Sequence, residues 1–134
     1  MNKCIVRLQT ADAACVIDHE AMSALRDAVG ADAFDEILED ALFEITERLS
    51  RIERLAQQGK FAAVGAVAHD VVAVAGQIGM ADVSRVAASL EYCCLDEDEI
   101  SARAVSERLV RIGGDSLIAA AEVSVDLAIS ADSA

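Results

Sequence analysis

Proline is absent from all 134 residues of this chain, and glycine occurs only 7 times. These two residues most often mark the turns between strands, so a chain with so few of them is poorly suited to a many-stranded fold. Apolar residues make up 54% of the sequence, whereas Phe, Tyr and Trp together contribute only 3%. The composition therefore predicts an all-α fold, and the length predicts one domain with a single core.

The charge balance is strongly acidic. With 24 acidic and 11 basic residues, the formal net charge is -13 and the isoelectric point is about 4.3. Phosphate backbones and anionic lipids would be repelled by such a chain, so we expect neither nucleic acid nor a membrane surface as a partner. Residues 61–81 are long enough to span a bilayer, but His69 and Asp70 near their centre argue against a membrane span.

The four cysteines show no spacing typical of a metal site or a disulfide framework. Cys4, Cys15, Cys93 and Cys94 lack a CxxC or Cys/His pattern. The first residues also lack the apolar run of a signal peptide. We therefore interpret the cysteines as reduced thiols and expect a cytoplasmic protein with no metal of its own.

Apolar residues recur every three or four positions through most of the chain, which predicts a series of helices. Asp18 caps a short helix that ends before Gly30, and a long helix follows over residues 31–56. A tight hairpin joins helices over residues 60–78 and 81–95. After the acidic loop 96–99 comes a last helix, which we expect to continue through Gly113 and Gly114.

These elements predict an antiparallel up-and-down four-helix bundle with an additional short N-terminal helix. We expect residues 1–15 to form an N-terminal arm, residues 16–130 the bundle, and residues 131–134 a C-terminal tail. In the helix over 60–78, the predicted core stripe is Phe61, Val64, Ala68, Val71, Ala75 and Ile78. In the last helix, the predicted buried positions are Ile100, Val105, Leu109, Ile112, Leu117, Ala120 and Leu127.

His69 lies off this core stripe, whereas the other histidine, His19, is expected to be an ordinary surface residue. The neighbours of His69 on its helix face are small and mostly apolar: Ala62, Gly65, Ala66, Val72, Ala73 and Gly76. One interpretation is a surface histidine on an alanine-rich helix. The other is an accessible imidazole at the centre of a docking site. A metal-ligand role is disfavoured, because no second His or Cys stands one helical turn away.

Residues 68–91, AHDVVAVAGQIGMADVSRVAASLE, resemble the signature of histidine-containing phosphotransfer (HPt) domains, the intermediates of multistep two-component phosphorelays. The matching residues are Ala68 with His69, Gly76, Gly79, and Leu90 with Glu91. The resemblance extends over residues 16–127 and implies a four-helix bundle with an extra N-terminal helix. It also implies that His69 is the phosphoacceptor and that Gly65, Ala66, Val72, Ala73 and Gly76 form the docking surface.

Two residues near His69 depart from the family pattern. Val72 and Ala73 stand where the family usually has a Lys and a Gly. That Lys normally lies beside the phosphoryl group, where its charge stabilises the phosphohistidine. A substitute cation would come from Arg48, Arg51 or Arg85, which the helix pattern brings level with His69. The alternative is that all three are ordinary salt-bridged surface residues.

The resemblance implies a phosphoryl carrier and not an enzyme with its own kinase site. His69 would accept a phosphoryl group from a receiver-domain aspartate and pass it to another receiver, so the expected partners are a response-regulator receiver domain and a hybrid histidine kinase. The carrier would need no cofactor of its own, since the receiver would supply Mg²⁺. We expect a monomer. Two alternatives remain: a degenerate HPt-like bundle that binds a receiver or kinase without being phosphorylated, and an unrelated helical bundle.

Overall fold

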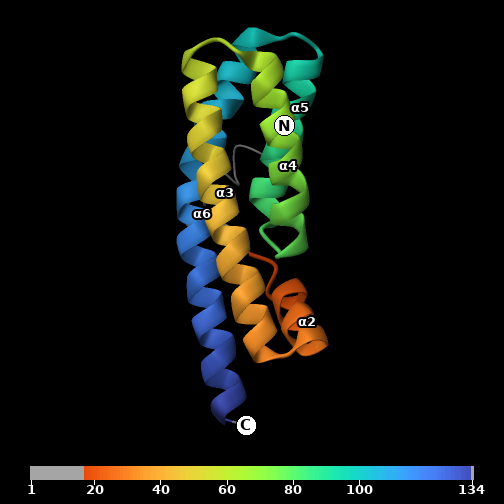
Figure 1. Ribbon diagram of the computed structural model, residues 1–134, viewed down its shortest axis with the longest axis vertical. Helices are drawn as coiled ribbons and strands as arrows, with labels where there is room; N and C mark the ends of the chain where they lie inside the picture. Colours follow the sequence, from red (N-terminus) through yellow and green to blue (C-terminus); the bar gives the residue numbers. More distant parts are fainter. Residues whose placement is uncertain (1–16, 134) are drawn as a thin grey trace, which may run out of the picture.

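The computed structural model describes residues 17–133, which form five helices and no strand. In chain order these are α2 (His19–Val29), α3 (Ala31–Gln57), α4 (Phe61–Gln77), α5 (Ala81–Leu95) and α6 (Glu99–Ser133). Helix α3 packs against α4 and α6, and α5 packs against the same two helices, so α3 to α6 form a closed ring around one core (Figure 1). The predicted all-α four-helix bundle with an extra short helix is confirmed.

Capping side chains and a glycine explain where α2 begins and ends and where α6 begins. The Asp18 carboxylate accepts a hydrogen bond of 3.0 Å from the backbone N–H of Ala21, which caps α2 as predicted. At the start of α6, the Asp98 carboxylate accepts one of 3.1 Å from Ser101 N–H, and this contact lowers the pKa of Asp98. Gly30 ends α2 with a φ of +90°, a conformation that glycine adopts without strain.

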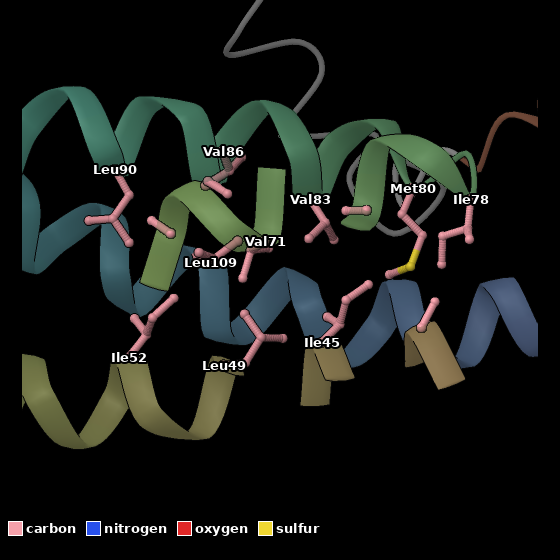
Figure 2. Packing of buried hydrophobic residues seen from close by; sticks show 14 of the residues in the cluster. Ile45, Leu49, Ile52, Val71, Ile78, Met80, Val83, Val86, Leu90 and Leu109 are labelled. Atoms are coloured by element: carbon pink, nitrogen blue, oxygen red, sulfur yellow. The ribbon is translucent and has the colours of Figure 1, made fainter. Parts of the chain in front are cut away.

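The core is built from the apolar stripe of every helix in the ring. Figure 2 shows side chains of α3, α4, α5 and α6, among them Ile45, Val71, Leu90 and Leu109, gathered in one buried cluster. The predicted core stripe of α4 is confirmed, because all of its members are buried: Phe61, Val64, Ala68, Val71, Ala75 and Ile78. This burial determines which side of α4 is left for solvent.

The last helix is continuous through its glycine pair, as predicted, but two expectations about it are wrong. Ile100 is 86% exposed and lies outside the core, and residues 131–133 continue α6 instead of forming a tail. The inner face of α6 carries small residues, including Ser106, Gly113 and Ser116. Because these residues are not strongly apolar, the hydrophobic pattern does not identify the buried face of α6. The predicted arm at residues 1–15 lies outside the described residues.

The two outer helices α3 and α6 are much longer than the α4–α5 hairpin, and they run past its turn in Figure 1. Helix α2 lies beside this extension and packs against α3. The backbone N–H of Asp18 donates a 2.8 Å hydrogen bond to the carbonyl of Gly79, which ties the start of α2 to the hairpin turn. The turn of the hairpin that carries His69 is therefore tied to the start of α2.

Candidate functional site

His69 projects from α4 into solvent. Its side chain is 71% exposed, because the neighbouring residues Ala68 and Val71 take the buried side of the helix. The expectation of an accessible imidazole off the core stripe is therefore confirmed. His19, the other histidine, is also exposed, at the start of α2.

The exposed imidazole is oriented by a carboxylate from the facing helix. Nδ1 of His69 lies 2.8 Å from Oε2 of Glu91 on α5, whose side chain is only 29% exposed. An ionised carboxylate can only accept hydrogen bonds, so this contact places the ring proton on Nδ1 of a neutral imidazole. Nε2 then keeps its lone pair and faces away from the Glu91 contact. The site thus presents one nucleophilic nitrogen in a defined orientation.

Sequence reasoning did not assign a role to Glu91. Its position in the Leu90-Glu91 motif was a signal of the resemblance, but the contact depends on how α4 and α5 pack, and 22 residues separate the two partners. The register of the hairpin brings them together. Further along the same pair of helices, Ser84 Oγ donates a 2.9 Å hydrogen bond to the carbonyl of Val72.

The residues predicted to form a docking surface differ in exposure, and their docking role stays a prediction. Ala66, Ala73 and Gly76 are exposed on α4, and Val72 is partly buried. Gly65 is buried and does not belong to an exposed surface: a Cβ added there would lie 2.9 Å from Cβ of Cys94. The lack of a side chain at this position allows α4 and α5 to approach closely.

Among residues 17–133, the three arginines proposed as substitutes for the missing Lys make no hydrogen bond or ion pair with His69. Arg48 makes a 3.0 Å ion pair with Glu44 and a 3.7 Å ion pair with Asp70. Arg85 pairs with Asp82 on its own helix. Arg51 is exposed on α3. Within residues 17–133, the hydrogen bond of His69 is with Glu91. That one of these arginines neighbours a phosphoryl group on His69 stays a prediction.

Among residues 17–133, the remaining reactive groups do not form a second centre. Burial raises the pKa of the Cys93 and Cys94 thiols, which keeps them in the protonated, unreactive form. Residues 17–133 contain no group of three or more His, Cys, Asp or Glu side chains placed to hold a metal ion. Over the same residues, no helix combines the length and apolarity needed to cross a membrane. Cys4 and Cys15 lie outside the described residues.

A family model, the Hpt domain, matches residues 36–123, well over half of the chain. The chain belongs to the Hpt domain family. The match includes all of α4 and α5 and therefore the His69–Glu91 pair. Searches of the curated proteins and of the solved structures found no match.

Membership of this family gives the helical hairpin a general role. Hpt domains are phosphocarrier modules of two-component phosphorelays, and they are not kinases. They interact with receiver domains and kinases in these relays. The exposed imidazole of this Hpt domain stands on the first helix of the hairpin, on the side of α4 that the core leaves free.

Proposed function

We propose that this Hpt domain is a histidine phosphotransfer protein in which His69 accepts a phosphoryl group from a receiver-domain aspartate and passes it to a second receiver. The observation that carries the proposal is the exposed imidazole with Nδ1 held by Glu91 at 2.8 Å. The partners are a response-regulator receiver domain and a hybrid histidine kinase. The exchange takes place in the cytoplasm and involves one copy of the chain.

The transfer needs little from this chain beyond an oriented nucleophile. The lone pair of His69 Nε2 attacks the phosphorus of the aspartyl phosphate, a P–N bond forms, and the bond from phosphorus to the carboxylate oxygen breaks. Nδ1 keeps its proton throughout, and Glu91 balances the positive charge that the ring acquires. In the onward step a receiver carboxylate attacks the same phosphorus, and the electron pair of the P–N bond returns to Nε2. The receiver brings the Mg²⁺ that such a transfer uses.

The small side chains around His69 support docking of a folded partner. Ala66, Ala73 and Gly76 are exposed and end at or before Cβ, so the backbone of α4 is open to close approach. The phosphorus of a partner's aspartyl phosphate must come within about 3 to 3.5 Å of Nε2 for in-line attack. Bulky neighbours would keep it further away.

The test is transfer of label from a phosphorylated receiver domain. We expect the wild type to acquire a label that is labile in acid and stable in base, as a phosphohistidine is, and His69→Ala to acquire none. His19→Ala is the matched control, because it removes the other exposed histidine and should leave labelling unchanged. Equal labelling of wild type and His69→Ala contradicts the proposal.

A second function is favoured by one observation. Val72 stands where the family usually has a Lys, and His69 has no basic side chain in contact among residues 17–133. These features suit a binding module that docks a receiver or kinase without accepting phosphate. Complex formation by size-exclusion chromatography, with no label on either wild type or His69→Ala, would support this function in place of phosphotransfer.

A further inference from the structure

Three contacts between α4 and α5 follow one another along the same side of the hairpin. They join Gly65 to Cys94, His69 to Glu91, and Val72 to Ser84. On each helix, successive members of this series are three, four or seven residues apart, and residues at these spacings share a helix face. The hydrogen bond between His69 and Glu91 is therefore the middle contact of the three.

At Gly65 the two helices approach too closely for any side chain. Gly65 is buried, and a Cβ added there would lie 2.9 Å from Cβ of Cys94. Carbon atoms in ordinary contact are about 3.5 to 4.0 Å apart, so a methyl group at Gly65 needs roughly 0.6 to 1 Å of additional space. Cβ of Cys94 is attached directly to the α5 backbone and cannot rotate away. Helix α5 itself would therefore have to move.

Such a movement would be felt at the contact between His69 and Glu91. Gly65 precedes His69 by one helical turn and Cys94 follows Glu91 by one turn, so the two contacts are only about 5 Å apart along the helices. Nδ1 of His69 lies 2.8 Å from Oε2 of Glu91, and a hydrogen bond does not extend beyond about 3.5 Å. The Glu91 side chain is only 29% exposed, so its surroundings limit how far it can follow the ring.

The third contact holds the helices together on the other side of His69. Ser84 Oγ donates a 2.9 Å hydrogen bond to the carbonyl of Val72. This bond ties α5 to α4 on the side of the hairpin turn, whereas Gly65 lies on the side away from that turn. A methyl group at Gly65 would therefore act as a wedge, which separates the helices at Gly65 and His69 more than at Val72.

We propose that Gly65 is a positioning residue for phosphoryl transfer: its lack of a side chain sets the separation of α4 and α5 at which Glu91 holds Nδ1 of His69. This inference rests on the proposed function and adds to it a residue outside the exposed surface. Because Gly65 is buried, it contacts neither the phosphoryl donor nor a docked partner. Its effect on the reaction is exerted through Glu91.

Two substitutions at Cys94 separate the steric contact from other effects of changing Gly65. Gly65→Ala introduces the clash. Adding Cys94→Gly removes the opposing Cβ and should relieve the clash, whereas adding Cys94→Ala leaves that Cβ in place and should not. Both substitutions delete the thiol, so thiol chemistry cannot explain a difference between them. Gly114→Ala is the matched control, because it makes the same change at an exposed helical position where an added Cβ meets no described residue within 4 Å.

The first measurement is the tautomer of the His69 imidazole, by nitrogen-15 NMR in mildly alkaline solution. We expect the Nδ1–H tautomer in the wild type, in Gly114→Ala and in Gly65→Ala/Cys94→Gly. A mixture is expected in Gly65→Ala and in Gly65→Ala/Cys94→Ala. The rescue variant carries an extra glycine within α5, which lowers helix propensity, so recovery of the tautomer cannot be attributed to recovered helix stability.

Two results of this measurement would overturn the inference. One is an unchanged Nδ1–H tautomer in folded Gly65→Ala. The other is a mixture of tautomers in folded Gly65→Ala/Cys94→Gly. Circular dichroism establishes which variants are folded. If Gly65→Ala does not fold, the rescue variant decides alone, since it keeps the methyl group at residue 65 and removes only the atom that the methyl group would meet.

The second measurement is the rate of His69 phosphorylation by phosphoramidate, a small donor that needs no docking surface. Nε2 attacks the phosphorus, a P–N bond to the ring forms, the P–N bond of the donor breaks, and ammonia leaves. We expect Gly65→Ala to lower the rate about tenfold, and Gly65→Ala/Cys94→Gly to return it to within about twofold of the wild type.

A double-mutant cycle with Glu91 tests the route by which Gly65 acts. In a Glu91→Ala background, Gly65→Ala should change the phosphorylation rate by less than about twofold, because the contact that it disturbs is already absent. A further loss of about tenfold in that background would show that Gly65 does not act through Glu91, and would overturn the inference.

Failure of the inference and failure of the proposed function give different results. Absence of label on His69 of the wild type, with phosphoramidate and with a phosphorylated receiver domain, would contradict the proposed function. The tautomer measurement needs no phosphorylation. It would still decide whether Gly65 sets the contact between His69 and Glu91.

Discussion

A carboxylate beside an imidazole decides which ring nitrogen can react. In this Hpt domain Glu91 holds Nδ1 of His69 at 2.8 Å, and the ring is otherwise open to solvent. The pair is half-exposed, so its contribution to the free energy of unfolding is small. Its effect is on the tautomer and on ring orientation, which both matter for attack by Nε2.

Removal of the Glu91 carboxylate should therefore slow phosphorylation without unfolding the protein. We expect Glu91→Ala to lower the rate of His69 labelling by roughly tenfold to a hundredfold. Glu91→Gln should lose less, because the amide oxygen still accepts from Nδ1–H. Nitrogen-15 NMR of the imidazole should show the Nδ1–H tautomer in the wild type and a mixture in Glu91→Ala.

Glu107→Ala serves as the control for this prediction. Glu107 is an exposed glutamate on α6 and is not hydrogen-bonded to His69. Its replacement by alanine changes the net charge by the same amount as Glu91→Ala but leaves the imidazole contact intact. Unchanged labelling of Glu91→Ala together with an unchanged tautomer would show that the contact does not orient the nucleophile.

Helix α6 contains two adjacent glycines that have opposite effects on packing. Gly113 is buried, and a Cβ added there would lie 2.3 Å from Cδ1 of Leu49 on α3. Gly114 is exposed, and a Cβ there would meet nothing within 4 Å. The first glycine lets α3 and α6 pack closely, whereas nothing in the packing requires the second.

We expect Gly113→Ala and Gly114→Ala to change stability in opposite directions. Overpacking against Leu49 costs about 1 to 3 kcal/mol, which outweighs the helix propensity that alanine gains. Gly114→Ala should stabilise the protein by about 0.5 to 1 kcal/mol, because only the propensity changes. Urea unfolding followed by circular dichroism measures both. A stabilised Gly113→Ala variant would show that the Leu49 side chain turns away from the added methyl group at little cost.

A net charge of -13 on 134 residues destabilises the folded state through repulsion between like charges. The ion pairs found among residues 17–133 involve few of the carboxylates: Arg48 pairs with Glu44 and Asp70, Arg85 with Asp82, and His69 contacts Glu91. Compaction therefore brings many unpaired like charges closer together. Packing of the apolar core offsets this repulsion.

Stability should consequently rise with moderate salt. Raising NaCl from about 10 to 200 mM shortens the Debye length to below 10 Å, and we expect the free energy of unfolding to increase by about 1 kcal/mol. Thermal or urea unfolding at pH 7 measures the change. At pH 5, nearer the isoelectric point of about 4.3, the gain should be smaller. A stability that falls with salt at pH 7 would mean that attractive ion pairs dominate.

The fold could be predicted from the sequence because helix ends and helix faces are set by residues that lie close together in the chain. Asp18 and Asp98 cap helices through contacts within three residues, and the α4 stripe from Phe61 to Ile78 has a regular helical period. The wrong predictions of burial lie in α6, where apolar residues do not follow the helical period. Ile100 is apolar but exposed, whereas the buried inner face of α6 carries Ser106 and Gly113. The identity of a side chain predicts burial poorly when the neighbouring helix needs a small one.

The helix face on which His69 lies could likewise be predicted from nearby residues, whereas the contacts of its imidazole could not. The spacing of apolar residues was enough to place His69 off the core stripe among small residues, because a helical period assigns faces without knowledge of the partner helix. Only the packing of α4 against α5 decided that Glu91 reaches Nδ1, that Gly65 is covered by Cys94, and that the nearby arginines pair elsewhere. Those contacts join residues far apart in the chain, and their geometry depends on the register and separation of whole helices.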